Sequence, residues 1–124
     1  MNWYGTMKCV VTNQTGGTIF GLSASHQWKG YTDLATNVPP TMENGQSVTF
    51  IINVGSGGSD EWAVRFNDAQ GNCWYRQGKQ CNVEEDDLNS KAPVHLNLLS
   101  SSQGFSIELP SSSSCPHNHY DACS

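Results

Sequence analysis

Basic side chains are scarce in this sequence. Lysine and arginine together number 6 in 124 residues, against 11 aspartates and glutamates, and the formal net charge is −5. Proteins that bind nucleic acid gather lysine and arginine against the phosphates, and anionic bilayers attract the same residues. The composition therefore argues against nucleic acid and an anionic membrane as partners, which leaves neutral lipids, glycans and proteins.

Long apolar runs are also missing. Nowhere are there about 18 consecutive apolar residues, so we expect no transmembrane segment, and any contact with a membrane would be peripheral. Residues 1–5 lack a basic region followed by an apolar run, so we expect no signal peptide in this chain. The sequence leaves open the oligomeric state and whether Met1 is native.

Catalytic motifs are the third absence. The sequence has no G-x-S-x-G, and Cys9 falls in the middle of a predicted strand, where a thiol is usually buried and inert. His26 and His95 have no catalytic motif beside them. We therefore expect a protein that is not an enzyme and that needs no cofactor, unless its C-terminal cysteines and histidines bind a metal.

Alternation of apolar and polar residues is the dominant pattern. In residues 48–54 every even-numbered side chain is apolar, and Thr49 and Asn53 lie between them. Successive side chains of a strand point to opposite faces, so this pattern predicts antiparallel strands with one buried face. Further strands are expected at residues 7–11, 18–28, 62–67, 72–77, 94–98 and 105–109. About seven short strands predict an all-β fold, a single antiparallel β-sandwich.

Serine-rich sequence follows the last predicted strand. Pro110 and the serines at 111–114 end the alternating pattern, and a chain of 124 residues has the usual size of one domain. We therefore expect the sandwich domain to cover residues 1–110, and residues 111–124 to form a serine-rich tail. The acidic residues 84–87 suit the first turn of a short helix better than a calcium site.

Five cysteines give a clue to the compartment. Cys73 and Cys81 lie eight positions apart, as do Cys115 and Cys123, and Cys9 is left over. The simplest pairing is two local bridges, Cys73–Cys81 and Cys115–Cys123, with one buried thiol. These bridges would favour a secreted or extracellular protein. Free thiols in a cytosolic protein would give the same sequence, so the localisation stays open.

Tryptophan and tyrosine are frequent near the predicted strand ends. They suit surfaces that are half apolar and half wet, such as a lipid headgroup layer or the face of a sugar. We predict a ligand-binding patch that contains Trp28, Lys29 and Tyr31 together with Trp74 or Tyr75. The alternative is that these rings only close the ends of a small sandwich.

The C-terminal tail contains a separate candidate site. Cys115, His117, His119 and Cys123 could hold zinc or copper with two sulfur and two nitrogen ligands. The alternative is a tip closed by a disulfide, with both histidines in solvent.

Several strand and turn residues resemble a small domain family, named for its up-regulation in a nematode insulin-receptor mutant. The similarity spans most of residues 8–115 and implies no activity. The matching positions are residues 10–16, residues 62–66, Asp68, Gly71, Cys81, Asp86 and residues 111–115.

More loosely, the opening strand and the aromatic-rich loops resemble aegerolysins and actinoporin-like proteins, which are β-sandwiches that recognise membrane lipids. The leading hypothesis is therefore a non-enzymatic protein that binds a neutral membrane lipid or cell-surface ligand through loop aromatics, with a defence or toxin-like role. A carbohydrate-binding lectin is the first alternative, and metal binding by the tail is the second.

Overall fold

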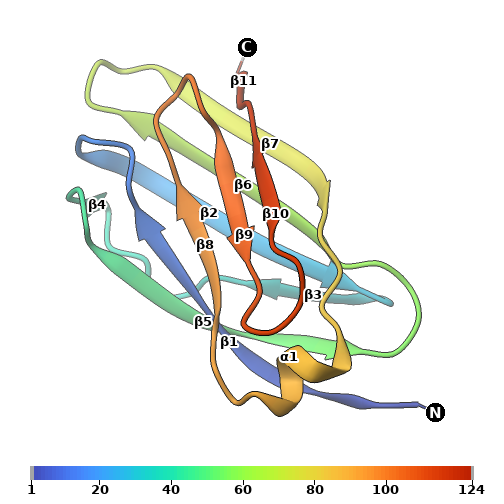
Figure 1. The fold of residues 1–124 in the computed structure, drawn as a ribbon. Coiled ribbons are helices and arrows are strands. Elements are labelled where there is room, and N and C mark those ends of the chain that lie inside the picture. The colour runs from blue at the N-terminus through green and yellow to red at the C-terminus, as the bar shows by residue number, and fades with distance from the viewer. Residues whose placement is uncertain (1, 124) are drawn as a thin grey trace.

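The computed structural model describes residues 2–123, apart from the side chains of residues 116–118. Two β-sheets face each other (Figure 1). The first sheet has the strand order β10-β9-β8-β1-β5 and consists of β1 (Tyr4–Asn13), β5 (Ser47–Gly55), β8 (Val94–Leu98), β9 (Phe105–Glu108) and β10 (Cys115–Asn118). The second has the order β11-β7-β6-β2-β3 and consists of β2 (Ile19–Trp28), β3 (Tyr31–Leu34), β6 (Glu61–Asp68), β7 (Cys73–Gln80) and β11 (Asp121–Ala122), with β4 (Thr41–Met42) paired to the start of β2.

The all-β prediction is confirmed, and the alternating pattern has its expected cause. On β6 the side chains of Trp62, Val64 and Phe66 are buried while Arg65 between them is exposed. Equivalent side chains of both sheets meet in one apolar core between the layers. The structure differs from the prediction in strand number, since the described residues form eleven strands.

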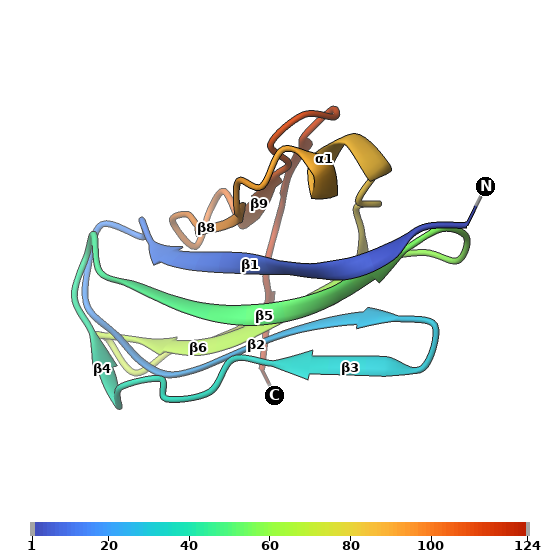
Figure 2. The same ribbon diagram turned by 90° about the horizontal axis from the view of Figure 1, so that it is seen from below.

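One strand pair is parallel, which the antiparallel prediction did not foresee. β8 runs beside β1 in the same direction, from the pair Cys9–Val94 to the pair Asn13–Leu98. It therefore covers only the second half of β1. The helix α1 (Glu85–Asn89) lies beside the first half (Figure 2). No helix among residues 2–123 is both long and apolar enough to span a membrane.

The acidic run begins α1, as expected, but one of its carboxylates is not in solvent. Asp87 is buried, and its oxygens accept hydrogen bonds from the backbone N–H groups of Glu84, Ser111 and Ser112 and from the Ser112 hydroxyl. Burial opposes ionisation of Asp87, but these hydrogen bonds outweigh it and hold the pKa of the carboxyl below its usual range. Asp87 thus ties α1 to the serine-rich segment.

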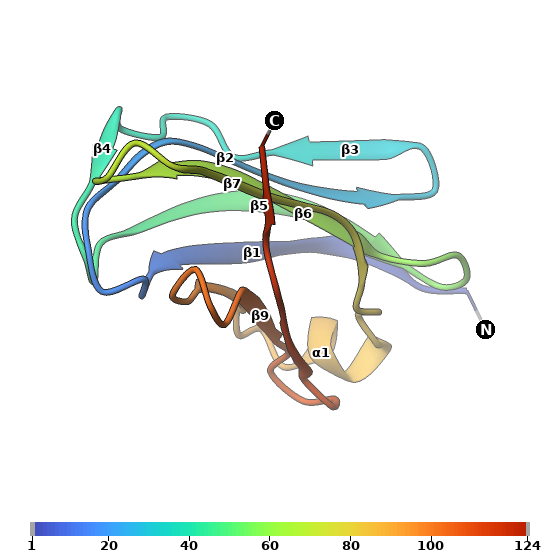
Figure 3. The same cartoon turned by 90° about the horizontal axis from the view of Figure 1, so that it is seen from above.

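That serine-rich segment is not a separate tail. β10 pairs with β9 of the first sheet, and β11 pairs with β7 of the second. Residues 115–123, here called the C-terminal strap, therefore cross from one layer to the other (Figure 3). Between the two strands Tyr120 is buried against Phe66 and Phe105, and its hydroxyl donates to the carbonyl of Leu99. The strap is therefore part of the domain and contributes Tyr120 to its core.

The disulfide pairing predicted from spacing is wrong. The bridges are Cys73–Cys123 and Cys81–Cys115. Cys73 begins β7 and Cys81 follows its end. An extended strand of that length separates its ends by roughly 26 Å, whereas a disulfide needs Cα atoms within about 7 Å. Cys9 is left free and buried as expected, and burial raises the pKa of its thiol to about 12.

Candidate functional site

Three aromatic rings meet at one corner of the molecule. Trp28 ends β2, Tyr31 begins β3, and Tyr4 begins β1 of the other sheet. The ring centroid of Trp28 lies 5.8 Å from that of Tyr31 and 6.0 Å from that of Tyr4. The two tyrosine centroids are 6.2 Å apart. The predicted neighbours Trp28 and Tyr31 are thus in contact, and Tyr4 joins them from the first sheet.

A tight hairpin sets this arrangement. Lys29 and Gly30 form the two-residue connection between β2 and β3, with φ angles of 44° and 83°. Two successive positive φ angles are typical of a type I′ turn, whose twist matches that of the paired strands. The turn places Tyr31 directly opposite Trp28 in the strand register.

Within the cluster, Trp28 supports the other two rings. It is buried, its indole N–H donates to the carbonyl of Gly57 over 2.9 Å, and the Lys29 ammonium lies 5.5 Å from its ring centroid. The surfaces that face solvent belong to Tyr4 and Tyr31. The Tyr31 hydroxyl, burial and the charge of Asp33 raise the pKa of Tyr4. The Tyr4 phenol is therefore neutral at physiological pH.

Beneath the hairpin lies a buried histidine between two carboxylates. The Nδ1 atom of His26 is 3.0 Å from Asp33, and its Nε2 atom is 2.6 Å from Asp60. Each ring nitrogen of His26 is therefore within hydrogen-bonding distance of one carboxylate. Asp60 also accepts from the Val83 N–H, and Asp33 accepts from the backbone and side-chain N–H groups of Asn53 on β5. The network therefore fastens β3 to β5.

This network was not predicted, although the sequence contains a sign of it. Leu22, Ala24, His26 and Trp28 alternate along β2 on the buried face. A histidine in such a register is buried, and a buried polar group needs hydrogen-bond partners. The partners themselves lie far along the chain or across a turn. They are not visible in a local pattern.

Exposed apolar side chains gather along the same border. Five large apolar side chains of the described residues are well exposed, and four of them come from β3, β5 and the start of β1. These four, which we call the apolar edge, are Tyr4 at 56%, Tyr31 at 46%, Leu34 at 61% and Ile51 at 53% exposure. The fifth, Phe20 at 40%, lies at the opposite end of β2.

Trp74 and Tyr75 are not part of the aromatic corner. They lie near the start of β7, opposite Phe66 and Arg65, whereas the aromatic corner adjoins the other end of β6. The Trp74 indole N–H donates to Asp68 over 2.9 Å, and this bond heads the interactions that lower the pKa of Asp68. The structure therefore groups Trp28, Lys29 and Tyr31, and separates them from Trp74 and Tyr75.

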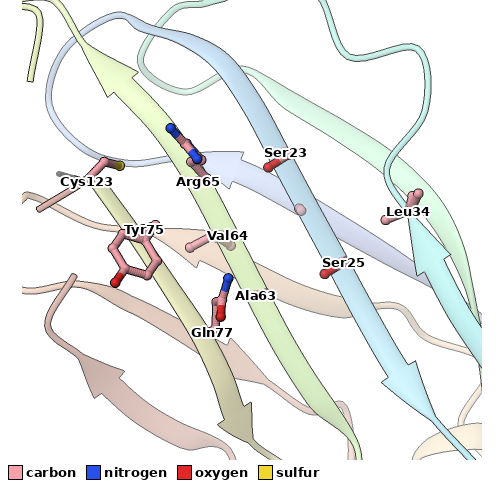
Figure 4. A pocket seen from close by; sticks show the side chains of 10 residues that line it. Ser23, Ser25, Leu34, Ala63, Val64, Arg65, Tyr75, Gln77 and Cys123 are labelled. Carbon is pink, nitrogen blue, oxygen red and sulfur yellow. The ribbon is translucent and has the colours of Figure 1, made fainter. Parts of the chain in front are cut away.

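The outer face of the second sheet carries a polar hollow of about 490 Å³ (Figure 4). Tyr75 and Gln77 on β7 line one side of it, Ser23 and Ser25 on β2 line the other, and Arg65 on β6 lies between them. Hydroxyl, amide and guanidinium groups around one aromatic ring can hydrogen-bond a polar ligand while the ring packs on its apolar face.

The predicted tetrahedral metal site would need two thiolates that the structure does not offer. Cys115 and Cys123 are both in disulfides, so neither is available as a thiolate ligand. His119 is exposed, and the side chain of His117 lies outside the described ones. Within the described part of the chain, no three His, Cys, Asp or Glu side chains are arranged to hold a metal ion.

The chain matches no known family model and no curated protein sequence, so the two resemblances of its sequence stay predictions.

Proposed function

We propose that the apolar edge binds the headgroup region of a neutral lipid membrane. The observation that carries this proposal is the exposure of Tyr4 and Tyr31 side by side on a buried tryptophan. Tyrosine concentrates at the membrane–water interface, where the ring contacts apolar groups and the hydroxyl stays hydrated. Leu34 and Ile51 flank the two tyrosines on the border strands β3 and β5, Leu34 towards the hollow on the second sheet and Ile51 towards the first sheet.

Rigidity of this border also supports the proposal. Asp33 joins β3 to β5 through two hydrogen bonds from Asn53, of 2.9 and 2.7 Å. The Tyr4 hydroxyl donates to the side chain of the same Asn53 over 2.8 Å. Because the rings are held in place before binding, little side-chain entropy is lost on contact with a membrane. The two disulfides also suit an oxidising, extracellular location.

Co-sedimentation with neutral liposomes tests the proposal. Vesicles of phosphatidylcholine, with and without sphingomyelin and cholesterol, should pellet the protein, and Tyr31→Ala should weaken partitioning by roughly tenfold because one half-exposed ring is lost. Phe20→Ala is the matched control, since it removes an exposed ring outside the apolar edge. Failure to pellet with every composition would overturn the proposal, as would an equal loss in the Phe20 variant.

The polar hollow favours a second candidate, a glycan site. Tyr75 offers a ring, and Ser23, Ser25, Arg65 and Gln77 offer hydrogen-bonding groups around it. Neutral oligosaccharides of glucose, galactose, mannose and N-acetylglucosamine are suitable probes. Titration by nuclear magnetic resonance should shift the amide signals around Tyr75, and Tyr75→Ala should abolish the shifts. Tyr31→Ala should leave them unchanged, which separates this site from the membrane surface.

A further inference from the structure

A groove of about 760 Å³ runs along the first half of β1. It exists because β8 pairs only with the Cys9–Asn13 half of that strand. Beside residues 4–8 the neighbour is the segment 88–93, which joins α1 to β8. The volume falls in the usual range for small-molecule sites, roughly 300–1,000 Å³.

Aliphatic side chains line both sides of the groove. Leu88 and Pro93 line it from one side and Ile51 from the other, and Ile51 is 53% exposed. Gly5 leaves room for the Leu88 side chain, because a Cβ atom at that position would lie 2.8 Å from one of its methyl carbons. A chain of methylene groups would therefore contact aliphatic carbon on both sides.

Charge in the groove has the opposite sign to the rest of the protein. Lys8 and Lys91 line it, and no aspartate or glutamate does, although acidic residues outnumber basic ones 11 to 6 in the whole chain. The exposed carboxylates of α1, Glu85 and Asp86, belong to the same helix as Leu88 but do not line the groove. A ligand that fits this environment carries a negative charge.

Lys91 occupies a backbone position that normally belongs to glycine. It follows the last turn of α1 with a φ of 64°, and its N–H donates to the carbonyl of Leu88 over 3.3 Å. Helices commonly end with a glycine in this left-handed conformation, because a side chain there is strained. Strained backbone positions concentrate at functional sites, so the strain at Lys91 points to a role for its ammonium group.

We propose that this groove binds a long-chain fatty acid, with the alkyl chain between Ile51 and Leu88 and the carboxylate at Lys8 and Lys91. This inference does not rest on the proposed function. The groove takes an anionic ligand through two lysines, whereas the apolar edge contacts neutral lipid through two tyrosines. The two sites share Tyr4 and Ile51. Variants at these two residues are therefore unsuitable for telling the sites apart.

The first test compares three probes that share a ten-carbon chain. Decanoate, decanol and decyltrimethylammonium are titrated into the whole protein below their aggregation limits, and amide chemical shifts are followed. Decanoate should shift the signals of residues 88–93 and Lys8. The dissociation constant from these shifts should be at least tenfold lower for decanoate than for either other probe. The proposal is overturned if decanoate leaves these signals in place, or if the cation or the alcohol binds there equally well.

The second test uses paired lysine variants. The double variant Lys8→Gln and Lys91→Gln should lose at least tenfold in decanoate affinity, while Lys29→Gln should keep the affinity of the unmodified chain. Lys29 is a close match, because it is exposed and also has a positive φ. Lys91→Gly should weaken binding while raising the unfolding midpoint, since strain is relieved. Unchanged decanoate affinity in the double variant would overturn the assignment.

The two proposed sites can fail separately. Tyr31→Ala should reduce pelleting with neutral liposomes and leave decanoate binding intact. The Lys8 and Lys91 double variant should lose decanoate binding and still pellet with neutral liposomes. If Tyr31→Ala removed both activities, the groove would not be an independent site.

Discussion

The two long borders between the sheets are closed by different kinds of interaction. On one side the C-terminal strap crosses from β10 to β11, and the disulfide Cys81–Cys115 links the layers covalently. On the other side β3 and β5 are joined by hydrogen bonds from Asn53 to Asp33, backed by the buried His26. Each border also carries a tyrosine, Tyr120 in the strap and Tyr31 at the start of β3.

The tyrosines show what this difference means. Tyr120 is 6% exposed and packs between two phenylalanines, so its ring serves the core. Tyr31 is 46% exposed and rests on Trp28, so its ring is available to a partner. The strap border is sealed, which means that its tyrosine ring is buried. The β3–β5 border is open, which means that buried hydrogen bonds join its strands while its aromatic rings stay exposed to solvent. For this reason the proposed membrane-binding surface lies on the β3–β5 border.

Removing the bridge across the strap border should have the largest effect. Cys81→Ala combined with Cys115→Ala opens a link with a sequence separation of 34 residues, and the chain-entropy model gives a loss on the order of 4 kcal/mol. Urea unfolding followed by tryptophan fluorescence measures the change. A loss below about 1 kcal/mol would mean that hydrogen bonds and Tyr120 close this border without the covalent link.

Breaking the buried hydrogen-bond network of His26, Asp33 and Asp60 should weaken the opposite border by about 3 kcal/mol. His26→Asn leaves Asp33 and Asp60 buried without the imidazole between them, and a buried polar group that loses its hydrogen-bond partner is costly. The half-buried His95 on β8 offers the matched control, and His95→Asn should stay within about 0.5 kcal/mol. Equal effects of the two substitutions, again in urea unfolding, would show that the network does not hold β3.

Asp87 links α1 to the segment that leads into the strap. We expect this link to make the free energy of unfolding depend on pH. Because hydrogen bonds lower the pKa of this carboxyl in the folded state, its contribution is present at neutral pH. That contribution is lost as the pH falls below the unfolded value of about 3.9 and through the folded pKa. Asp87→Asn should cost roughly 2 kcal/mol at pH 7, and the difference from the unmodified chain should shrink towards pH 3.

Urea unfolding midpoints between pH 7 and pH 2.5 measure this dependence. Asp86→Asn, one position earlier and exposed, controls for the change in net charge. A difference between Asp87→Asn and the unmodified chain that stayed constant with pH would contradict the explanation.

Local patterns in the sequence were sufficient to predict the strands and part of the aromatic corner. Alternation predicts which face of β6 is buried, because side-chain direction depends only on neighbouring residues. Only Lys29 and Gly30 separate Trp28 from Tyr31 in the chain, so a turn formed by these two residues brings the rings together. Both features depend on interactions between residues a few positions apart.

Features that depend on distant segments were not predictable in this way. The parallel pairing of β8 with β1 depends on the path of the chain between them. The disulfides follow from the strap crossing the sheets, which the spacing of the cysteines does not encode. Tyr4 reaches the aromatic corner only because the first residues of β1 lie across from the β2–β3 hairpin. Trp74 and Tyr75 are separated from it by the length of the sheet.

The smallest predicted effect compares the two border tyrosines directly. Tyr120→Phe removes a buried hydroxyl that donates to the Leu99 carbonyl over 3.1 Å, and should destabilise the protein by about 1 kcal/mol. Tyr31→Phe changes a half-exposed side chain and should stay within about 0.5 kcal/mol. Both are measured by urea unfolding, and Tyr31→Phe is also tested with neutral liposomes, where the retained ring should preserve binding. If Tyr31→Phe instead proved the more destabilising of the two, the Tyr31 side chain would be part of the structural closure of its border, and the contrast between a sealed and an open border would fail.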